Sequence, residues 1–110
     1  GKSHDTFGPI GPWLVTPDEL PAGAAGLKIE CRLDGVVMQS SNTSNLIFDV
    51  ATTIHLLSTF MTLEAGDLLV MGTPGGVGIA RNPPVWMKAG QLSAVEIEGV
   101  GLLVNPIVAE

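Results

Sequence analysis

Strict alternation over residues 27–33 constrains this chain more than any other feature of its sequence. The apolar positions are Leu27, Ile29, Cys31 and Leu33, and the three residues between them are charged. Period-two alternation predicts a strand with one buried face and one solvated face. Asp34-Gly35 follows at once and is typical of a two-residue hairpin turn. With residues 36–40 as the returning strand, the sequence predicts a β-hairpin over residues 27–40.

The rest of the chain indicates one helix and several further strands. Asp49 is suited to cap a helix over residues 49–61, in which Val50, Ile54, Leu57 and Met61 share one face. The continuous apolar run 68–71 predicts a strand buried on both faces, and strands are also expected near 92–97 and 102–105.

The first 26 residues are rich in proline and should be mostly extended loop. One helical turn is expected at residues 16–20, capped by Thr16. No linker or low-complexity tract divides the sequence. We therefore expect a single domain, residues 1–110, with an α+β fold that is mostly β.

Charge and composition exclude several classes of partner. The chain has 110 residues and a net charge of -6, from 5 basic and 11 acidic residues without a basic cluster. This balance argues against nucleic acid and anionic membrane surfaces, and no run approaches the roughly 20 apolar residues that span a bilayer. Cys31 is the single cysteine, so no internal disulfide forms. Without a signal segment at the start, a cytoplasmic protein, or a piece of one, is expected.

Two glycine-containing segments are candidates for phosphate or carboxylate sites. Gly1-Lys2-Ser3 looks like the end of a phosphate-binding loop, but the earlier glycine is absent and no helix pattern follows, so we reject that interpretation. Residues 72–78 are glycine-rich and follow the apolar run. Their backbone N–H groups and the Thr73 hydroxyl suit a carboxylate or enolate oxygen. A tight turn that needs glycine for positive φ explains the same pattern equally well.

Glu96 and Glu98 lie two apart on an expected strand and therefore point to the same side. Such a pair can hold a divalent cation, but no third ligand is near in sequence. Val95 and Ile97 supply the apolar side of the same strand. The polar face of an edge strand is the favoured interpretation.

Four segments, in order along the chain, resemble motifs of the fumarylacetoacetate hydrolase family. They are residues 1–13 (GKSHDTFGPIGPW), 42–48 (NTSNLIF), 62–78 (TLEAGD through GTPGGVG) and 95–101 (VEIEGVG). The first segment is most similar to the branch that includes 2-hydroxyhepta-2,4-diene-1,7-dioate isomerases. The resemblance covers the second half of the family's domain, part of a mixed β-roll, so exposed edges and apolar surface are expected.

The resemblance implies roles for a few residues of this chain. Lys2 matches the family lysine beside the metal, which contacts a substrate oxygen and would stabilise an enolate. Thr6 matches a position near the metal, and Gly72 and Thr73 match the loop that binds the substrate's carboxylate or carbonyl. The family's Mg²⁺ or Mn²⁺ ligands lie upstream of these motifs, so no principal metal ligand is expected in this chain.

The activity implied for a full-length parent is that of a metal-dependent hydrolase, isomerase or decarboxylase. Its substrates would be small 2-oxo acids or 1,3-diketo acids of aromatic catabolism, processed through an enolate, and the protein would be a homodimer. The alternative is an inactive truncated or split half that serves only as a structural or assembly partner.

Overall fold

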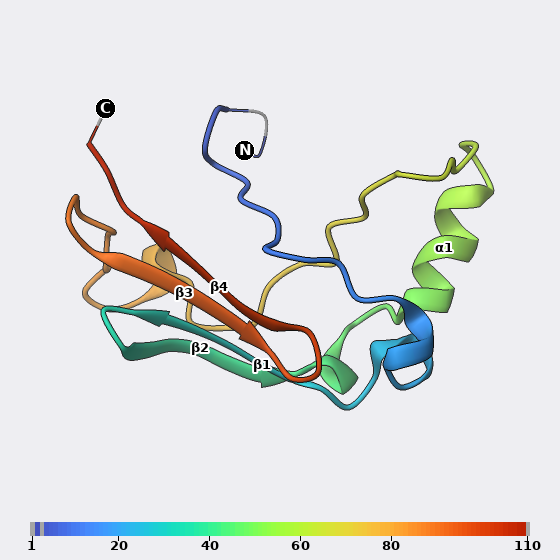
Figure 1. Cartoon of the computed structure of the whole chain (residues 1–110), viewed down its shortest axis with the longest axis horizontal. Coiled ribbons are helices and arrows are strands. Elements are labelled where there is room, and N and C mark those ends of the chain that lie inside the picture. The colour runs from blue at the N-terminus through green and yellow to red at the C-terminus, as the bar shows by residue number, and fades with distance from the viewer. Residues whose placement is uncertain (1, 3, 110) are drawn as a thin grey trace.

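The computed structural model describes Lys2 and residues 4–109, and its centre is a four-stranded antiparallel sheet (Figure 1). The strands are β1 (Lys28–Leu33), β2 (Val36–Asn42), β3 (Leu92–Ile97) and β4 (Gly101–Pro106), in the order β2-β1-β3-β4. The expected hairpin is confirmed as β1 and β2, with β2 two residues longer than expected. The mostly β, α+β fold class is likewise confirmed.

The hairpin turn also ties the sheet together. Asp34 and Gly35 have φ of 49° and 80°, and positive φ at both central residues is what a type I′ turn requires. The Asp34 carboxylate accepts hydrogen bonds from Leu92 N at 2.8 Å and from Gln91 Nε2 at 2.9 Å. This turn therefore anchors the start of β3 as well as joining β1 to β2.

A β-bulge interrupts the pairing of β1 with β2. Cys31 pairs with Gln39 but Arg32 pairs with Val37, so Met38 is the extra residue of β2. Because directly paired residues share a face of the sheet, the Gln39 side chain lies on the same face as Cys31. Met38 has no pairing partner on β1, and a bulged residue can offer its carbonyl oxygen to a donor outside the ladder.

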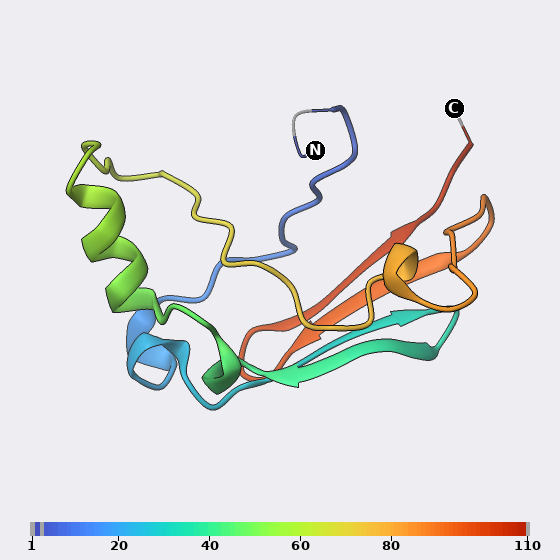
Figure 2. The same ribbon diagram turned by 180° about the vertical axis from the view of Figure 1, so that it is seen from behind.

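Helix α1 (Val50–Ser58) begins at the expected capping residue. Asp49 Oδ1 accepts from Thr52 N at 2.7 Å, which satisfies one of the free N–H groups of the first turn. The helix ends at Ser58, three residues before the expected end. None of its residues is buried, and it lies apart from the sheet at one end of the molecule (Figures 1 and 2).

Four short 3₁₀ turns lie in the connecting segments, at Pro17–Glu19, Ala22–Ala24, Thr43–Asn45 and Gly78–Ala80. The first confirms the helical turn expected near residues 16–20. Thr16 occupies the capping position, but its side chain makes no capping hydrogen bond, so that part of the prediction is wrong.

The prediction of a doubly buried strand at residues 68–71 is wrong. This segment belongs to no strand, and the side chains of Leu68 and Val70 are 64% and 70% exposed. A strand exists only when a neighbouring chain segment pairs with its backbone, and no described residue does so here.

The apolar core is small for a chain of this length. Among the described residues, Leu27 and Leu33 are the only buried hydrophobic side chains, and many large apolar side chains are exposed, as expected. The radius of gyration is 15.3 Å, whereas a compact domain of this length has about 13 Å. No helix among the described residues has the length and apolar character to cross a bilayer.

Candidate functional site

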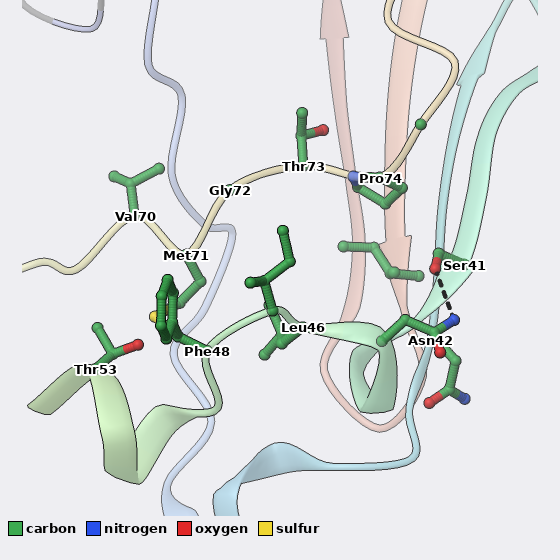
Figure 3. A pocket seen from close by; sticks show the side chains of 14 residues that line it. Ser41, Asn42, Leu46, Phe48, Thr53, Val70, Met71, Gly72, Thr73 and Pro74 are labelled. Carbon is green, nitrogen blue, oxygen red and sulfur yellow. Dashed lines mark hydrogen bonds between the residues drawn. The ribbon is translucent and has the colours of Figure 1, made fainter.

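The main cavity, of about 680 Å³, lies where the end of β2 faces the glycine-rich loop (Figure 3). Ser41, Asn42 and residues 45–48 form one wall, and residues 70–75 form the other. Two motifs that lie far apart in the sequence thus meet in one cavity. Gly72 and Thr73, the expected substrate-binding residues, belong to its lining.

The polar residues of the first wall are occupied by structural hydrogen bonds. Asn42 Nδ2 donates to Gly26 O at 2.9 Å, and its Oδ1 accepts from Ser44 N at 2.9 Å. Asn45 Nδ2 donates to Ser41 Oγ at 3.3 Å, the dashed line in Figure 3. These side chains shape the cavity, and a ligand would compete with existing bonds to use them.

Thr43, in the segment 42–48, connects the end of β2 to the segment that precedes β1. Its hydroxyl donates to Ala24 O at 2.6 Å and accepts from Leu27 N at 2.9 Å. Both hydrogen-bonding functions of the hydroxyl are therefore satisfied by backbone groups. The motif is structural at this position.

The glycine-rich loop is tethered to the sheet by two side chains. Gln39 Nε2 donates to Thr73 Oγ1 at 2.8 Å and to Pro74 O at 2.6 Å. Arg81 Nε donates to Gly76 O at 2.9 Å, and its Nη2 donates to the carbonyl of Met38. In the described part of the chain, every hydrogen bond from residues 68–76 to the rest comes from Gln39 or Arg81.

Gly76 brings the loop into direct contact with β2. Its φ is 103°, and a Cβ there would collide with the carbonyl oxygen of Met38. Glycine is therefore required both for the backbone conformation and for the close approach. The tight-turn explanation of this motif is correct at Gly76.

Gly72 and Thr73 keep unused hydrogen-bond donors. Among the described residues, neither backbone N–H group has a partner, and the Thr73 hydroxyl accepts from Gln39 without donating elsewhere. In Figure 3 the Thr73 side chain rises from the loop on the side away from Leu46 and Phe48. The cavity thus has an apolar wall on one side of the loop, and the neutral donors of Gly72 and Thr73, which suit a carboxylate or carbonyl oxygen, lie at its rim.

Lys2 and Thr6 lie outside the lining of this cavity. Both are exposed residues of the N-terminal segment, and Thr6 has a φ of 65°. The other members of the expected lysine motif, Gly1 and Ser3, fall outside the described residues. Of the four predicted site residues, only Gly72 and Thr73 line the cavity. The roles of Lys2 and Thr6 stay predictions.

The acidic pair Glu96 and Glu98 is engaged by basic and backbone donors. Arg32 Nη1 contacts Glu96 Oε2 at 2.8 Å, and Lys28 N donates to Glu98 Oε2 at 3.0 Å. This arrangement agrees with the polar face favoured by the sequence, but the expected edge position is wrong, because β3 pairs with both β1 and β4 and is an inner strand. Within the described residues, no three His, Cys, Asp or Glu side chains approach one another closely enough to hold a metal ion. These residues alone do not fit a divalent cation.

Gln39 and Arg81 are the site residues that sequence reasoning missed. Gln39 lies opposite Cys31, on the face where the alternation places apolar side chains. A polar side chain on such a face needs a hydrogen-bond partner, and that mismatch is a usable signal. Arg81 offers no comparable signal, because its acceptors are backbone carbonyls.

A search for relatives assigns the chain to a family. Residues 1–108 match the profile described as fumarylacetoacetate (FAA) hydrolase C-terminal. The chain belongs to this family, so the resemblance drawn from the four motifs is confirmed.

Individual relatives are similar over nearly the whole chain. The mitochondrial oxaloacetate tautomerase FAHD2A of Bos taurus is 48% identical over 108 residues, which are 98% of this chain and 34% of the relative. The chain thus spans about a third of the length of that relative.

Solved structures share the fold. The 2-hydroxyhepta-2,4-diene-1,7-dioate isomerase of Mycobacterium marinum is 41% identical, with a TM-score of 0.80 over 96% of this chain and 37% of that one. Maleylpyruvate hydrolase of Sphingobium sp. SYK-6, in complex with manganese(II) and pyruvate, is 34% identical, with a TM-score of 0.85 over 97% of this chain and 38% of that one.

Proposed function

We propose that the protein carrying this chain is an isomerase of 2-oxo acids that acts through an enolate. The observation that carries the proposal is the Gly72-Thr73 turn, whose two N–H groups and hydroxyl are available for a ligand at the rim of the cavity. A relative named for oxaloacetate tautomerisation and a structural neighbour bound to pyruvate support the substrate class.

Tautomerisation of a 2-oxo acid requires hydrogen-bond donors to the carbonyl oxygen, and this turn has such donors. When a base removes a proton from the carbon next to the 2-oxo group, the electron pair moves onto the carbonyl oxygen. Hydrogen-bond donors aimed at that oxygen stabilise the developing charge. Among the described lining residues none is ionisable at neutral pH, so the base would come from elsewhere in the protein.

We include a divalent metal, Mg²⁺ or Mn²⁺, in the proposal, with its ligands outside this chain. A neighbouring structure with manganese(II) supports it. The metal would bind the 2-oxo acid and favour its enolate. In this chain, Lys2 would add a positive charge near the enolate, and Thr6 would lie close to the metal.

The test uses the full-length protein with Mg²⁺ and oxaloacetate. Conversion of the ultraviolet-absorbing enol to the keto form should be faster with the protein than in buffer alone. Acylpyruvate hydrolysis and oxaloacetate decarboxylation are measured in parallel by product release. If the protein catalyses only hydrolysis or only decarboxylation, the isomerase assignment is wrong and the assignment of 2-oxo acids as substrates still holds.

Folded full-length protein that accelerates none of the three reactions, with either metal, would contradict the proposal. That result would favour the alternative of a structural or assembly role. Thr73→Val tests the contribution of the Thr73 hydroxyl, because it removes that hydroxyl at nearly constant side-chain volume. We expect a lower kcat/KM with an unchanged circular dichroism spectrum.

A further inference from the structure

We propose that Gln39 is a positioning residue that makes the Thr73 hydroxyl a hydrogen-bond donor to the substrate. The inference rests on the proposed function, since it concerns how the same turn binds a 2-oxo acid. It assigns a role to a β2 side chain that belongs to the sheet and does not line the cavity.

The orientation of the Gln39 amide follows from its acceptor. The carbonyl oxygen of Pro74 can only accept a hydrogen bond, and it lies 2.6 Å from Gln39 Nε2. The NH₂ group, rather than the amide oxygen, must therefore face the loop. Its second hydrogen is directed at Thr73 Oγ1, 2.8 Å away.

This bond determines what the Thr73 hydroxyl has left to offer. A hydroxyl that accepts from an NH₂ group keeps its own hydrogen for a different acceptor. Among the described residues no acceptor takes that hydrogen, and Thr73 is exposed at the rim. An oxygen atom of a bound 2-oxo acid supplies the missing acceptor.

Because Arg81 also holds the loop, the positioning role of Gln39 can be distinguished from simple anchoring of the loop. Arg81 holds Gly76 O and Met38 O independently of Gln39. The loop therefore keeps contacts to β2 when Gln39 is replaced. What is lost is the donor that biases the Thr73 hydroxyl towards the substrate.

The test is a double-mutant cycle in the full-length protein, read out as the inhibition constant of oxalate and as KM and kcat for oxaloacetate. Gln39→Met removes both hydrogen bonds at similar volume and should weaken oxalate binding by about tenfold, the usual effect of one hydrogen bond. In the Thr73→Val background the same change should weaken binding less than about twofold, since coupled residues are not additive.

Two further variants separate positioning from anchoring. Gln39→Glu places an acceptor beside Thr73, which draws the hydroxyl hydrogen away from the ligand, so we expect weaker oxalate binding than in Gln39→Met. Arg81→Met removes the other tether, and its effect should add to that of Thr73→Val. Thermal denaturation checks that every variant is folded.

Additive effects of Gln39→Met and Thr73→Val, or oxalate binding unchanged in Gln39→Met, would overturn the inference. If wild-type protein binds oxalate but turns over no 2-oxo acid, only the proposed function is wrong. The double-mutant cycle, measured through oxalate binding, still tests the role of Gln39. Wild-type protein that does not bind oxalate would overturn both.

Discussion

Glu30 lies between two basic residues of its own strand, β1. It is a buried carboxylate on one of the two inner strands, 7% exposed. Lys28 Nζ and Arg32 Nη2 contact its two oxygens at 2.6 Å and 2.5 Å. The hydrogen bond from Lys28 lowers the pKa of Glu30, the charge of Arg32 lowers it further, and burial opposes both effects.

This lowered pKa predicts a pH-dependent contribution to stability. A carboxyl whose folded-state pKa is depressed stabilises the fold above its unfolded pKa of about 4.5, and the contribution fades as pH falls through the folded value. Glu30→Gln should therefore reduce the free energy of unfolding at neutral pH, and the reduction should shrink in acid. Urea denaturation of the full-length protein at several pH values measures the difference.

Glu19→Gln is the matched control, because Glu19 is exposed and forms no ion pair within the described residues. Its effect should be small at every pH. A Glu30→Gln penalty that stays constant from neutral pH into acid would show that the ion pairs do not hold the carboxylate charged.

Gly75 and Gly76, two neighbouring glycines of the loop, differ in how they tolerate a side chain. Gly76→Ala forces a Cβ against the Met38 carbonyl and a strained backbone, which costs about 1–3 kcal/mol. At Gly75 a Cβ meets nothing within 4 Å, and φ is not positive. Urea denaturation should find Gly76→Ala clearly less stable than Gly75→Ala, and equal stability would mean that the loop does not pack on β2 as described.

Among the elements, local patterns were predictable and long-range pairings were not. The hairpin follows from alternation and Asp34-Gly35, both contained within 14 residues, and the start of α1 follows from its cap. Whether residues 68–71 form a strand depends on a neighbouring strand, which cannot be predicted from a local sequence pattern. Gln39 was missed for the same reason, since its partner Thr73 lies 34 residues away.

The turn between β1 and β2 joins the hairpin to β3 through the Asp34 carboxylate. Asp34→Ala removes the acceptor of two hydrogen bonds from the start of β3 and places alanine at a φ of 49°. We expect a loss of about 1–2 kcal/mol in the free energy of unfolding. Asp34→Asn keeps one oxygen acceptor and tolerates positive φ, so its loss should be smaller, as chemical denaturation would measure. Equal losses would mean that this turn does not anchor β3.

The molecule as a whole has an open shape with few buried apolar side chains. Two buried apolar side chains and a radius of gyration of 15.3 Å leave much of the apolar surface uncovered. The four sequence motifs identify the family correctly, and the structure shows that Gly72 and Thr73 line a cavity. They do not reveal what faces the exposed side chains, because that depends on packing partners rather than on local sequence.

The predicted role of Lys2 depends on the whole protein, because Lys2 lies outside the lining of the cavity in this chain. In the full-length protein, Lys2→Met should reduce kcat for oxaloacetate by at least about a hundredfold, as expected for loss of one enolate-stabilising group. The melting temperature should change little, since Lys2 is exposed. Unchanged turnover would remove Lys2 from the mechanism.

The most direct measurement is a crystal structure of the full-length protein with Mg²⁺ and oxalate, a mimic of the enolate. The account predicts an oxalate oxygen within hydrogen-bond distance of the Thr73 hydroxyl and the N–H groups of Gly72 and Thr73, with Gln39 still donating to Thr73. Oxalate bound elsewhere, with this turn free of ligand, would contradict the assignment of the cavity as the substrate site.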